Sequence, residues 1–459
     1  MDALDKLRAL LGKQVITDNQ VLQEVSIDFG RLVQRIPTAV VVPQSAADVS
    51  QVLQIATEEV WPVSTRGAAH SQSGQSLVQQ GLLLDMSGLN QTGDVQEESV
   101  WVDSGVTWRE LVSRVLPYGL VPPVLTNNLD VTVGGTLSMA GLGVASHRFG
   151  TQADNVEALE VVTGAGDLVQ CSPTENQDLF DCSRCGLGQF SVITRAKLRL
   201  RQCEPRVRTY FLLYDNIEAL MHDQTRVLSD QRFDFVEGWC SPCPQGLRNM
   251  GETKIPFAEW FYPAHLTIEY DKLPPSDSEI SDLNFYKKVY QEDSTLQEFL
   301  FRLDPVFQLW REGGVWTLPH PWMEVILPWE SAAGYIEGVL TNFPPNLLAG
   351  GHVLLWPCRG ATANVPLFMR PSGDLIMGFG ILPAVPRHLV RMAVPLLNRA
   401  SELAVQVGGK RYLSGWIEFD HSRWKDHFGD KWKQILQWKR FFDPSAILNP
   451  GFIHYSENE

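Results

Sequence analysis

The chain has 459 residues, more than a single hydrophobic core usually serves, so we expect two or three structural units. Hydrophobic residues make up 44% of it and charged residues 20%, which is typical of a globular protein. The formal net charge of -15 repels polyanions and no basic stretch offsets it, which argues against nucleic acid as a partner.

The first twenty residues mix acidic and basic side chains and contain no long apolar stretch. This pattern is typical of neither a secretory signal nor a membrane-spanning helix. The seven cysteines are an odd number and are spread thinly, which does not favour a disulfide framework. We therefore expect a soluble, cytoplasmic protein with no membrane partner.

Two Cys-x-x-Cys pairs, at 182–185 and 240–243, raise the question of a zinc site. The pairs lie much farther apart than the roughly 15–20 residues of compact zinc ribbons, and no histidine accompanies them. We expect unpaired buried thiols and no metal. His421 and His427 lie near acidic residues, and we interpret both as solvated surface rather than as metal ligands.

The first predicted unit begins with a strand and a helix. Residues 38–42 are β-branched and apolar, and Pro43 ends this strand. Ser45 is a candidate N-cap, with Asp48 three residues later as in a capping box. Apolar residues then follow at helical spacing, namely Val49, Val52, Leu53 and Ala56.

A second strand, at 61–63, runs directly into the segment 65–71, where small residues precede His70. Small residues after a strand let backbone N–H groups approach an anion closely, so this segment is a candidate phosphate site. On the sequence alone, however, an isolated loop histidine is more often structural or solvated than functional.

The next predicted elements are a helix near 109–115 and a hairpin with strands at 155–163 and 168–171. Two glycine-rich segments, 131–138 and 186–194, lie among these strands, and the second leads into a strand of its own. Such dense glycine indicates backbone folded tightly against something flat or charged. Neither a dinucleotide-binding GxGxxG after the first strand nor a GxxxxGK[ST] loop occurs, so any cofactor is held differently.

From about Gln202 the composition changes and aromatic residues become frequent. Strand-like segments at 207–214 and 375–379 alternate with helical ones such as 296–303, which predicts a second domain of α+β type with an aromatic-lined pocket. The alternative, that most tryptophans simply fill the core of this domain, stays open. An amphipathic helix is expected again from Trp424 onward.

Taken together, these segments resemble the vanillyl-alcohol-oxidase-type FAD-linked oxidoreductases, and specifically the cytokinin dehydrogenases. The resemblance spans nearly the whole chain and depends on the order and spacing of its segments, because each alone is a weak signal. They are Arg-Gly-Ala-Ala-His-Ser-Gln-Ser-Gly-Gln at 66–75, then 132–140, 161–164, 186–195, 235–238, Pro-His-Pro-Trp at 319–322, His-Phe-Gly at 427–429, Phe-Asp-Pro at 442–444 and 447–451.

The resemblance implies a two-domain α+β fold in which an FAD-binding domain, residues 1–202, is completed by residues 416–459. A substrate domain built on an antiparallel sheet lies between them, at 203–415. In the family, the loop matching 66–71 wraps the pyrophosphate with backbone donors, and the histidine matching His70 bonds to the flavin 8α carbon. The resemblance thus implies FAD, covalently held through His70.

By the same matching, the following residues line the cofactor: Arg66, Gly67, Ala68, Ala69, His70, Ser71, Gln75, Asn127, Thr132, Ser138, Leu142, Ile193, Tyr412, Asn449 and Phe452. Individually, Thr132 and Ser138 are equally compatible with ordinary strand and cap positions. Besides Asn127, which is considered below, two of these residues depart from the family. Ala69 replaces the glycine usual before the linking histidine, and Phe452 replaces a glutamine after Pro-Gly.

The reaction implied is oxidation of a secondary amine: hydride leaves carbon for the flavin, a carboxylate accepts the amine proton, and the imine hydrolyses to adenine and an aldehyde. The family's catalytic aspartate falls on Asn127, whose amide cannot accept a proton. General-base help is worth roughly 10²–10⁴ in rate, so we expect weak activity. Asp130 is a poor substitute if the strand is extended, because an odd offset places it on the opposite face.

Glu324, beside the Pro-His-Pro-Trp segment, is a second catalytic candidate that could reach the pocket, although its charge favours a surface position. The leading hypothesis is an FAD-dependent dehydrogenase of N6-isoprenoid adenines, with oxygen or a quinone as electron acceptor. A second is an FAD-linked oxidase of another amine or an alcohol. A third is a nearly inactive flavin-bearing protein that binds a small-molecule ligand.

Overall fold

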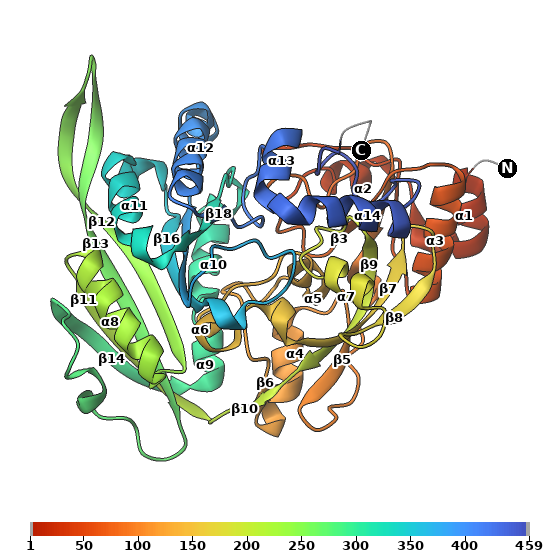
Figure 1. The fold of residues 1–459 in the computed structure, drawn as a ribbon. Coiled ribbons are helices and arrows are strands. Elements are labelled where there is room, and N and C mark those ends of the chain that lie inside the picture. Colours follow the sequence, from red (N-terminus) through yellow and green to blue (C-terminus); the bar gives the residue numbers. More distant parts are fainter. Residues whose placement is uncertain (1–2, 456–459) are drawn as a thin grey trace.

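The computed structural model describes residues 3–455, and Figure 1 shows two halves with separate sheets. The first sheet has the order β1-β2-β4-β3, in which β2, β4 and β3 run parallel. Its strands are β1 (Val15–Ile16), β2 (Ala39–Val41), β4 (Leu82–Asp85) and β3 (Val63–Arg66). Helices α1 (Ala3–Leu11) and α3 (Ala46–Glu58) bury their apolar faces against one side, and Leu22 of α2 (Asn19–Glu24) packs on the other.

A second, antiparallel sheet in the same half has the order β5-β9-β7-β8. Its strands are β5 (Ser99–Asp103), β9 (Ser191–Arg199), β7 (Val156–Thr163) and β8 (Leu168–Cys171). The helices associated with it are α4 (Trp108–Val115), α5 (Val133–Leu137) and α7 (Gln177–Ser183), whereas α6 (Ser146–Phe149) packs against β16 (His352–Arg359) of the other half. A short ribbon of β6 (Leu120–Val121) and β10 (Arg201–Gln202) precedes the other half.

The other half is built on eight strands, and every pairing between them is antiparallel. In spatial order they are β14 (Lys287–Thr295), β11 (Arg206–Tyr214), β13 (Thr253–Tyr270), β12 (Phe235–Met250), β16 (His352–Arg359), β17 (Leu375–Leu382), β15 (Met323–Pro328) and β18 (Lys410–Arg411). The α+β fold with an antiparallel sheet, expected from the resemblance, is confirmed.

The two faces of this sheet meet different partners because side chains alternate along each strand. Met323, Val325 and Leu327 pack in one core with α8 (Ile217–Asp230), α11 (Trp329–Asn342) and α12 (Val390–Gln406). Ile326 belongs to the core shared with the first half, and Glu324 has the same parity along the strand as Ile326. The sheet therefore presents Glu324 toward the boundary between the two halves.

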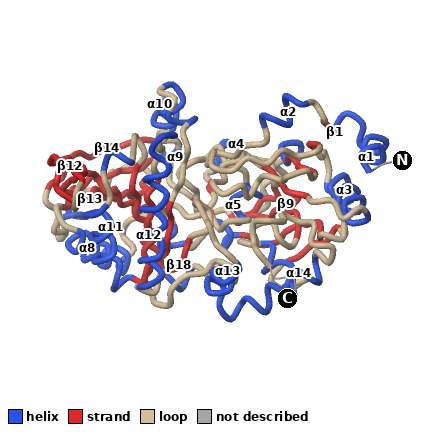
Figure 2. The backbone as a smooth tube through the Cα atoms, turned by 90° about the horizontal axis from the view of Figure 1, so that it is seen from above, coloured by secondary structure: helices blue, strands red, loops and turns tan. Residues whose placement is uncertain are grey.

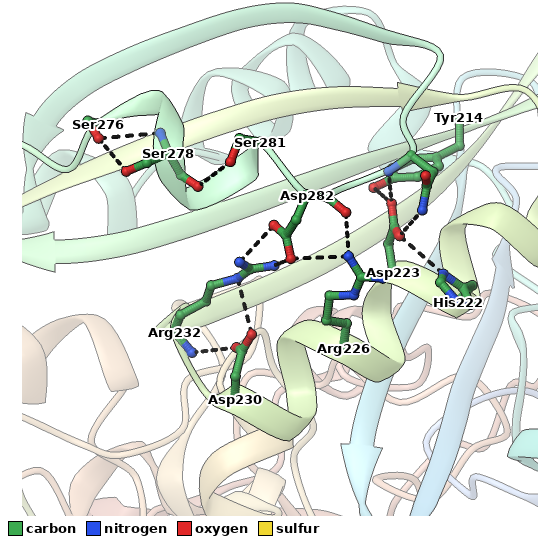
Figure 3. A network of polar contacts seen from close by, with 11 residues as sticks. Tyr214, His222, Asp223, Arg226, Asp230, Arg232, Ser276, Ser278, Ser281 and Asp282 are labelled. Carbon is green, nitrogen blue, oxygen red and sulfur yellow. Dashed lines mark hydrogen bonds and ion pairs between the residues drawn. The ribbon is translucent and has the colours of Figure 1, made fainter.

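A polar network fastens α8 to the connection after β13, as Figure 3 shows. Buried Asp223 accepts hydrogen bonds from the Tyr214 hydroxyl at 3.0 Å and from the Asn284 side chain at 2.9 Å. Arg226 and Arg232 both pair with Asp282. These groups lie outside the cavity described below, so we assign them a structural role.

The C-terminal segment returns to the first half through α13 (His421–Phe428) and α14 (Trp432–Phe442), and Figures 1 and 2 show both chain ends there. The Val63 amide donates to Ile447 O at 2.8 Å, and the Asn449 amide donates to Val63 O at 2.7 Å. The buried Lys439 ammonium donates to Asp443 and to the Leu448 carbonyl. The tail is thereby bonded to the strand that carries the His70 loop.

Element ends differ from the sequence expectations by a few residues. The strand expected at 61–63 is β3, which begins at Val63. The helix expected at 296–303 ends at Leu300, and a new helix, α10 (Asp304–Glu312), begins beside Pro305; α9 spans Leu296–Leu300. Proline lacks an amide hydrogen and suits a helix start, which explains the break. Among residues 3–455, no helix is both long and apolar enough to cross a membrane.

Candidate functional site

A cavity of about 280 Å³ lies where the eight-stranded sheet faces the first half of the molecule. Most residues predicted from the resemblance line it: Gly67, Ala68, Ala69, His70, Ser71, Gln75, Asn127, Thr132, Ser138, Leu142, Ile193, Tyr412 and Asn449, together with Glu324. They come from sequence positions more than 380 residues apart. The fold therefore brings the predicted site residues together.

The loop after β3 lines the cavity with residues 67–72. Its carbonyl groups at Ala69 and Ser71 accept hydrogen bonds from the Phe29 and Gly30 amides, both at 2.9 Å. The amides of residues 67–70 donate to no acceptor among the residues that the structure describes. A row of free N–H groups beside a cavity suits an anionic ligand such as the FAD diphosphate. The residues present thus fit the expected cofactor.

Two backbone features explain why small residues precede His70. A Cβ atom on Gly67 would lie 2.1 Å from Thr132 Oγ1, so only glycine lets the loop approach the start of α5 this closely. Ala69 has φ of +54°, in the left-handed region that favours glycine. Ala69 therefore holds its position under backbone strain.

His70 lies among aromatic rings. Its ring centroid is 4.0 Å from that of Phe29 and 5.5 Å from that of Trp322. Burial lowers the pKa of His70 to about 4, so the imidazole is neutral at ordinary pH. A neutral imidazole has a free lone pair, which formation of a bond to carbon requires.

Asp28 supports the His70 loop, and the sequence analysis did not predict it as a site residue. Its Oδ2 accepts hydrogen bonds from Ser71 Oγ at 2.9 Å and from the Gly74 amide at 2.7 Å. Burial raises the pKa of Asp28 to about 6. Gln75 ties the same segment to the far part of the chain, since its Nε2 donates to Leu413 O at 3.3 Å. Asp28 precedes the first predicted strand and belongs to no motif, so no sequence signal identified it.

Asn127 faces the cavity with both polar atoms of its amide engaged. Nδ2 donates to Glu237 Oε1 at 2.9 Å, and Oδ1 accepts from Arg302 at 3.1 Å. Arg302 also binds Glu237 Oε2 at 3.2 Å. Glu237 is only 2% exposed; burial alone would raise its pKa, but Arg302, His265 and Asn127 together hold the pKa well below its usual range.

The segment that carries Asn127 is a loop and not the extended strand we expected, because residues 126–132 form turns without ladder partners except one bridge to Thr107. The strand-alternation argument about Asp130 therefore does not apply. Asp130 is instead held by Arg109 and by Arg311, at 3.4 Å from the latter, and is not among the cavity-lining residues.

Glu324 corrects a second expectation, since its side chain is buried rather than on the surface. It is 6% exposed, lies on β15 and lines the cavity. Ser414 Oγ donates to its Oε2 at 2.6 Å. Burial raises the pKa of Glu324 to about 7. It is the single carboxylate among the described residues that line the cavity.

The side chains of two predicted cofactor residues, Arg66 and Phe452, do not line the cavity. Arg66 directs its guanidinium to the carbonyls of Val25 and Ile27. Phe452 is buried, with its ring centroid 5.4 Å from that of Trp424. Thr132 lines the cavity and also caps α5, since its Oγ1 accepts from the Gly135 amide at 3.4 Å.

The aromatic-lined pocket predicted for the second domain is confirmed for four tryptophans: Trp310, Trp316, Trp322 and Trp356. Trp260 instead fills the helix-side core. His352, which no motif marked, also lines the cavity, with its ring 5.3 Å from that of Trp310. Burial lowers the pKa of His352 to about 4.

All seven cysteines are free thiols, and five of them are buried. Within the described residues, no group of three His, Cys, Asp or Glu side chains is arranged to hold a metal ion. His427 is buried rather than solvated, because α13 packs it against Phe419 and Phe428.

Comparisons with known proteins cover both halves. Residues 37–172 match the family "FAD binding domain", and residues 274–453 match "Cytokinin dehydrogenase 1, FAD and cytokinin binding". The protein is 35% identical over 440 residues to an uncharacterized oxidoreductase, ORF5 in the fasciation locus of Rhodococcoides fascians, covering 95% of this protein and 98% of that one. It is 30% identical to cytokinin dehydrogenase 10 of Oryza sativa subsp. japonica (95% and 88% covered) and 29% identical to cytokinin dehydrogenase 1 of Arabidopsis thaliana (94% and 80%).

Proposed function

The chain belongs to the cytokinin dehydrogenase family of FAD-dependent oxidoreductases, and from this premise we propose that it oxidises the C–N bond between the isoprenoid group and N6 of N6-isoprenoid adenines. Bound FAD supplies the hydride acceptor. The protein's own residues hold the cofactor, orient the amine and exclude water. We further propose that His70 carries the flavin covalently.

The observation that carries this proposal is the meeting of two kinds of surface in one cavity. The loop around His70 offers free amides and a neutral imidazole. The facing wall, from α10 and the eight-stranded sheet, offers Trp310 and Trp356. Aromatic side chains stack well on purine rings, so this wall suits an adenine.

Asn127 orients the substrate in this proposal but takes no proton. Glu237 and Arg302 fix its amide, and an amide has no basic nitrogen. Relative to a site with a carboxylate there, we expect oxidation to be slower by roughly 10²–10⁴. A substrate amine has to lose its proton to another group or to water.

That same fixed amide favours a second candidate, a flavin-bearing protein that binds its ligand and turns over too slowly to matter. Oxidation of another amine or of an alcohol is the third. Hydride transfer from an alcohol also requires a base, so Asn127 alone does not favour it over an amine.

Anaerobic mixing with N6-isopentenyladenine distinguishes these functions. Bleaching of the visible flavin band supports amine oxidation. A shifted band without bleaching supports ligand binding without catalysis, and an unchanged band rejects this substrate class. Admitting oxygen or adding a quinone to the reduced protein then identifies the electron acceptor.

Acid precipitation of the purified protein tests the covalent bond. A yellow pellet supports attachment to the protein, whereas a colourless pellet with yellow supernatant contradicts it.

The free thiols of all seven cysteines support a reducing, cytoplasmic location.

A further inference from the structure

Glu324 is a buried carboxyl with few hydrogen-bond partners. Ser414 Oγ donates to Oε2, while Oε1 has no hydrogen-bond partner within residues 3–455. Arg411 is a nearby cation, but its guanidinium is directed elsewhere: Nε donates to the main-chain oxygen of Glu324, and the two other nitrogens bind Ser401 and Trp416. A carboxyl placed here for structure alone would be costly, because burial without full pairing is unfavourable.

The surroundings of Glu324 are otherwise apolar and tightly packed. A Cβ atom on Gly415 would lie 3.3 Å from Glu324 Oε2, and one on Gly380 would lie 3.2 Å from the Trp356 ring. Tyr412 also lies in the cavity wall, and its hydroxyl accepts a hydrogen bond from the Gly141 amide at 3.1 Å. Since Glu324 lines the cavity and only its Oε2 is bonded to Ser414, Oε1 remains available to a ligand there.

Asn127 and Glu324 lie in different parts of the cavity and would contact different parts of a ligand. Asn127 is bonded to Glu237 on β12, and Glu324 lies on β15, with β16 and β17 between them. Three strand spacings separate the two carboxyls by about 14 Å across the sheet. Gly238, next to Glu237, pairs with Leu355, next to Trp356. The Trp356 ring lies close to Gly380, which pairs with Glu324.

The orientation of a bound purine follows from the aromatic residues. Phe307 and Trp310 of α10, with Trp316 beyond it, form the stacking surface of the cavity. A purine stacked there, with its N6 substituent continuing over Trp356, directs the end of that substituent toward Glu324.

We propose that Glu324 is a specificity-determining residue that accepts a hydrogen bond from a hydroxyl group at the end of the substrate's isoprenoid side chain. This inference rests on the proposed oxidation of N6-isoprenoid adenines and narrows it to hydroxylated side chains. A side chain ending in hydrocarbon strips water from Oε1 without replacing its hydrogen bond. A hydrogen bond to the Glu324 carboxyl makes the hydroxylated substrate better by roughly tenfold.

The test compares N6-isopentenyladenine with its terminally hydroxylated analogue in anaerobic flavin reduction by the full-length holoenzyme. We expect the wild type to favour the hydroxylated substrate by at least about tenfold in second-order rate constant. Glu324→Gln keeps an acceptor oxygen and should retain part of the preference. Glu324→Leu should bring the two substrates within about twofold of each other.

A purely structural role for Glu324 predicts equal losses for both substrates, which would overturn the inference. If the Leu variant does not hold flavin, the Gln variant alone carries the comparison. Equal reduction of both substrates by the wild type overturns the inference while leaving the proposed function intact. If neither substrate bleaches the flavin, the proposed function fails, and the ratio of their dissociation constants from the band shift then tests the inference. If substrates methylated at N9 of the purine no longer show the effect of the Glu324 variants, Glu324 contacts the purine ring and not the end of the side chain.

Discussion

Asn127 Nδ2 donates to Glu237 Oε1 across 2.9 Å, and Arg302 bonds to both residues. An amide at position 127 lets Glu237 stay ionised, because it presents a donor to the carboxylate. A carboxyl at the same position would present a second negative charge. The amide of Asn127 is therefore matched to its charged neighbours.

The first prediction concerns restoring the carboxylate. Asn127→Asp supplies a general base and should speed flavin reduction by N6-isopentenyladenine, by roughly 10²-fold or more. Two adjacent carboxyls titrate as a pair with one pKa raised, so the gain should be larger at about pH 8 than at about pH 6. Stopped-flow absorbance measures this rate. Asn128→Asp adds the same charge one residue away and serves as control; an Asn127→Asp rate no better than that of the control would contradict the assignment.

A second prediction tests the charge of Glu237. Glu237→Gln leaves Arg302 without its buried counter-ion and should lower the free energy of unfolding by about 3 kcal/mol at neutral pH. The folded pKa of Glu237 lies below the 4.5 of the free side chain, so its contribution is present above pH 4.5 and is lost as the pH falls below that value. Urea unfolding at about pH 7 and about pH 4 should thus show a gap between wild type and variant that narrows in acid. A gap of constant size would argue that Glu237 is not held ionised.

A third prediction concerns His70. His70→Ala should yield protein whose flavin is released by acid, because the proposed bond to the protein is gone. His352→Gln is the matched control, since His352 lines the same cavity and should leave the flavin in the pellet. A yellow pellet from the His70 variant would mean that another residue is linked to the flavin.

A fourth prediction follows from the strain at Ala69. With φ of +54°, Ala69→Gly should raise the free energy of unfolding by about 0.5–1 kcal/mol, after subtraction of the added freedom of the unfolded state. Ala68 is not in the left-handed region, so Ala68→Gly should lower stability by a similar amount. Chemical denaturation of both variants measures the difference, and the same sign for both would show that the strain at Ala69 is absent.

The sequence predicted the His70 loop because its information is local: a strand, small residues and one histidine lie within a few positions. It also located Asn127, but not what surrounds it. Glu237 belongs to a recognised segment, yet its role emerges only when Asn127 meets it from 110 residues away in the sequence. Arg302 and Asp28 belong to no motif, and only tertiary contacts place them in the site.

Glu324 shows why a charged residue was assigned wrongly to the surface. Along β15 the apolar Met323, Val325 and Leu327 face the helices, so alternation places Glu324 on the opposite face. In a two-layer protein that face would meet water. Here the first half of the molecule covers it, which no pattern within the strand could reveal.

The last prediction uses the pH dependence of stability to test whether Glu324 is buried as the structure has it. Its folded pKa of about 7 lies above the 4.5 of the free side chain, so the folded protein binds the extra proton between these values. Protonation therefore stabilises the fold below pH 4.5, and this contribution, roughly 3 kcal/mol, is lost as the pH rises through about 7. The groups that face the carboxyl from neighbouring segments are Arg411, Tyr412 and Ser414, and Glu324→Gln leaves them unchanged. The buried histidines are also unchanged, so their titration affects the stability of wild type and variant alike. In urea unfolding, the stability of the wild type relative to Glu324→Gln should fall between about pH 5 and about pH 8. Glu330→Gln, at an exposed position at the start of α11, removes the same charge outside the cavity and is the control. A difference between wild type and Glu324→Gln that does not change with pH would place the Glu324 carboxyl in water rather than in the cavity wall.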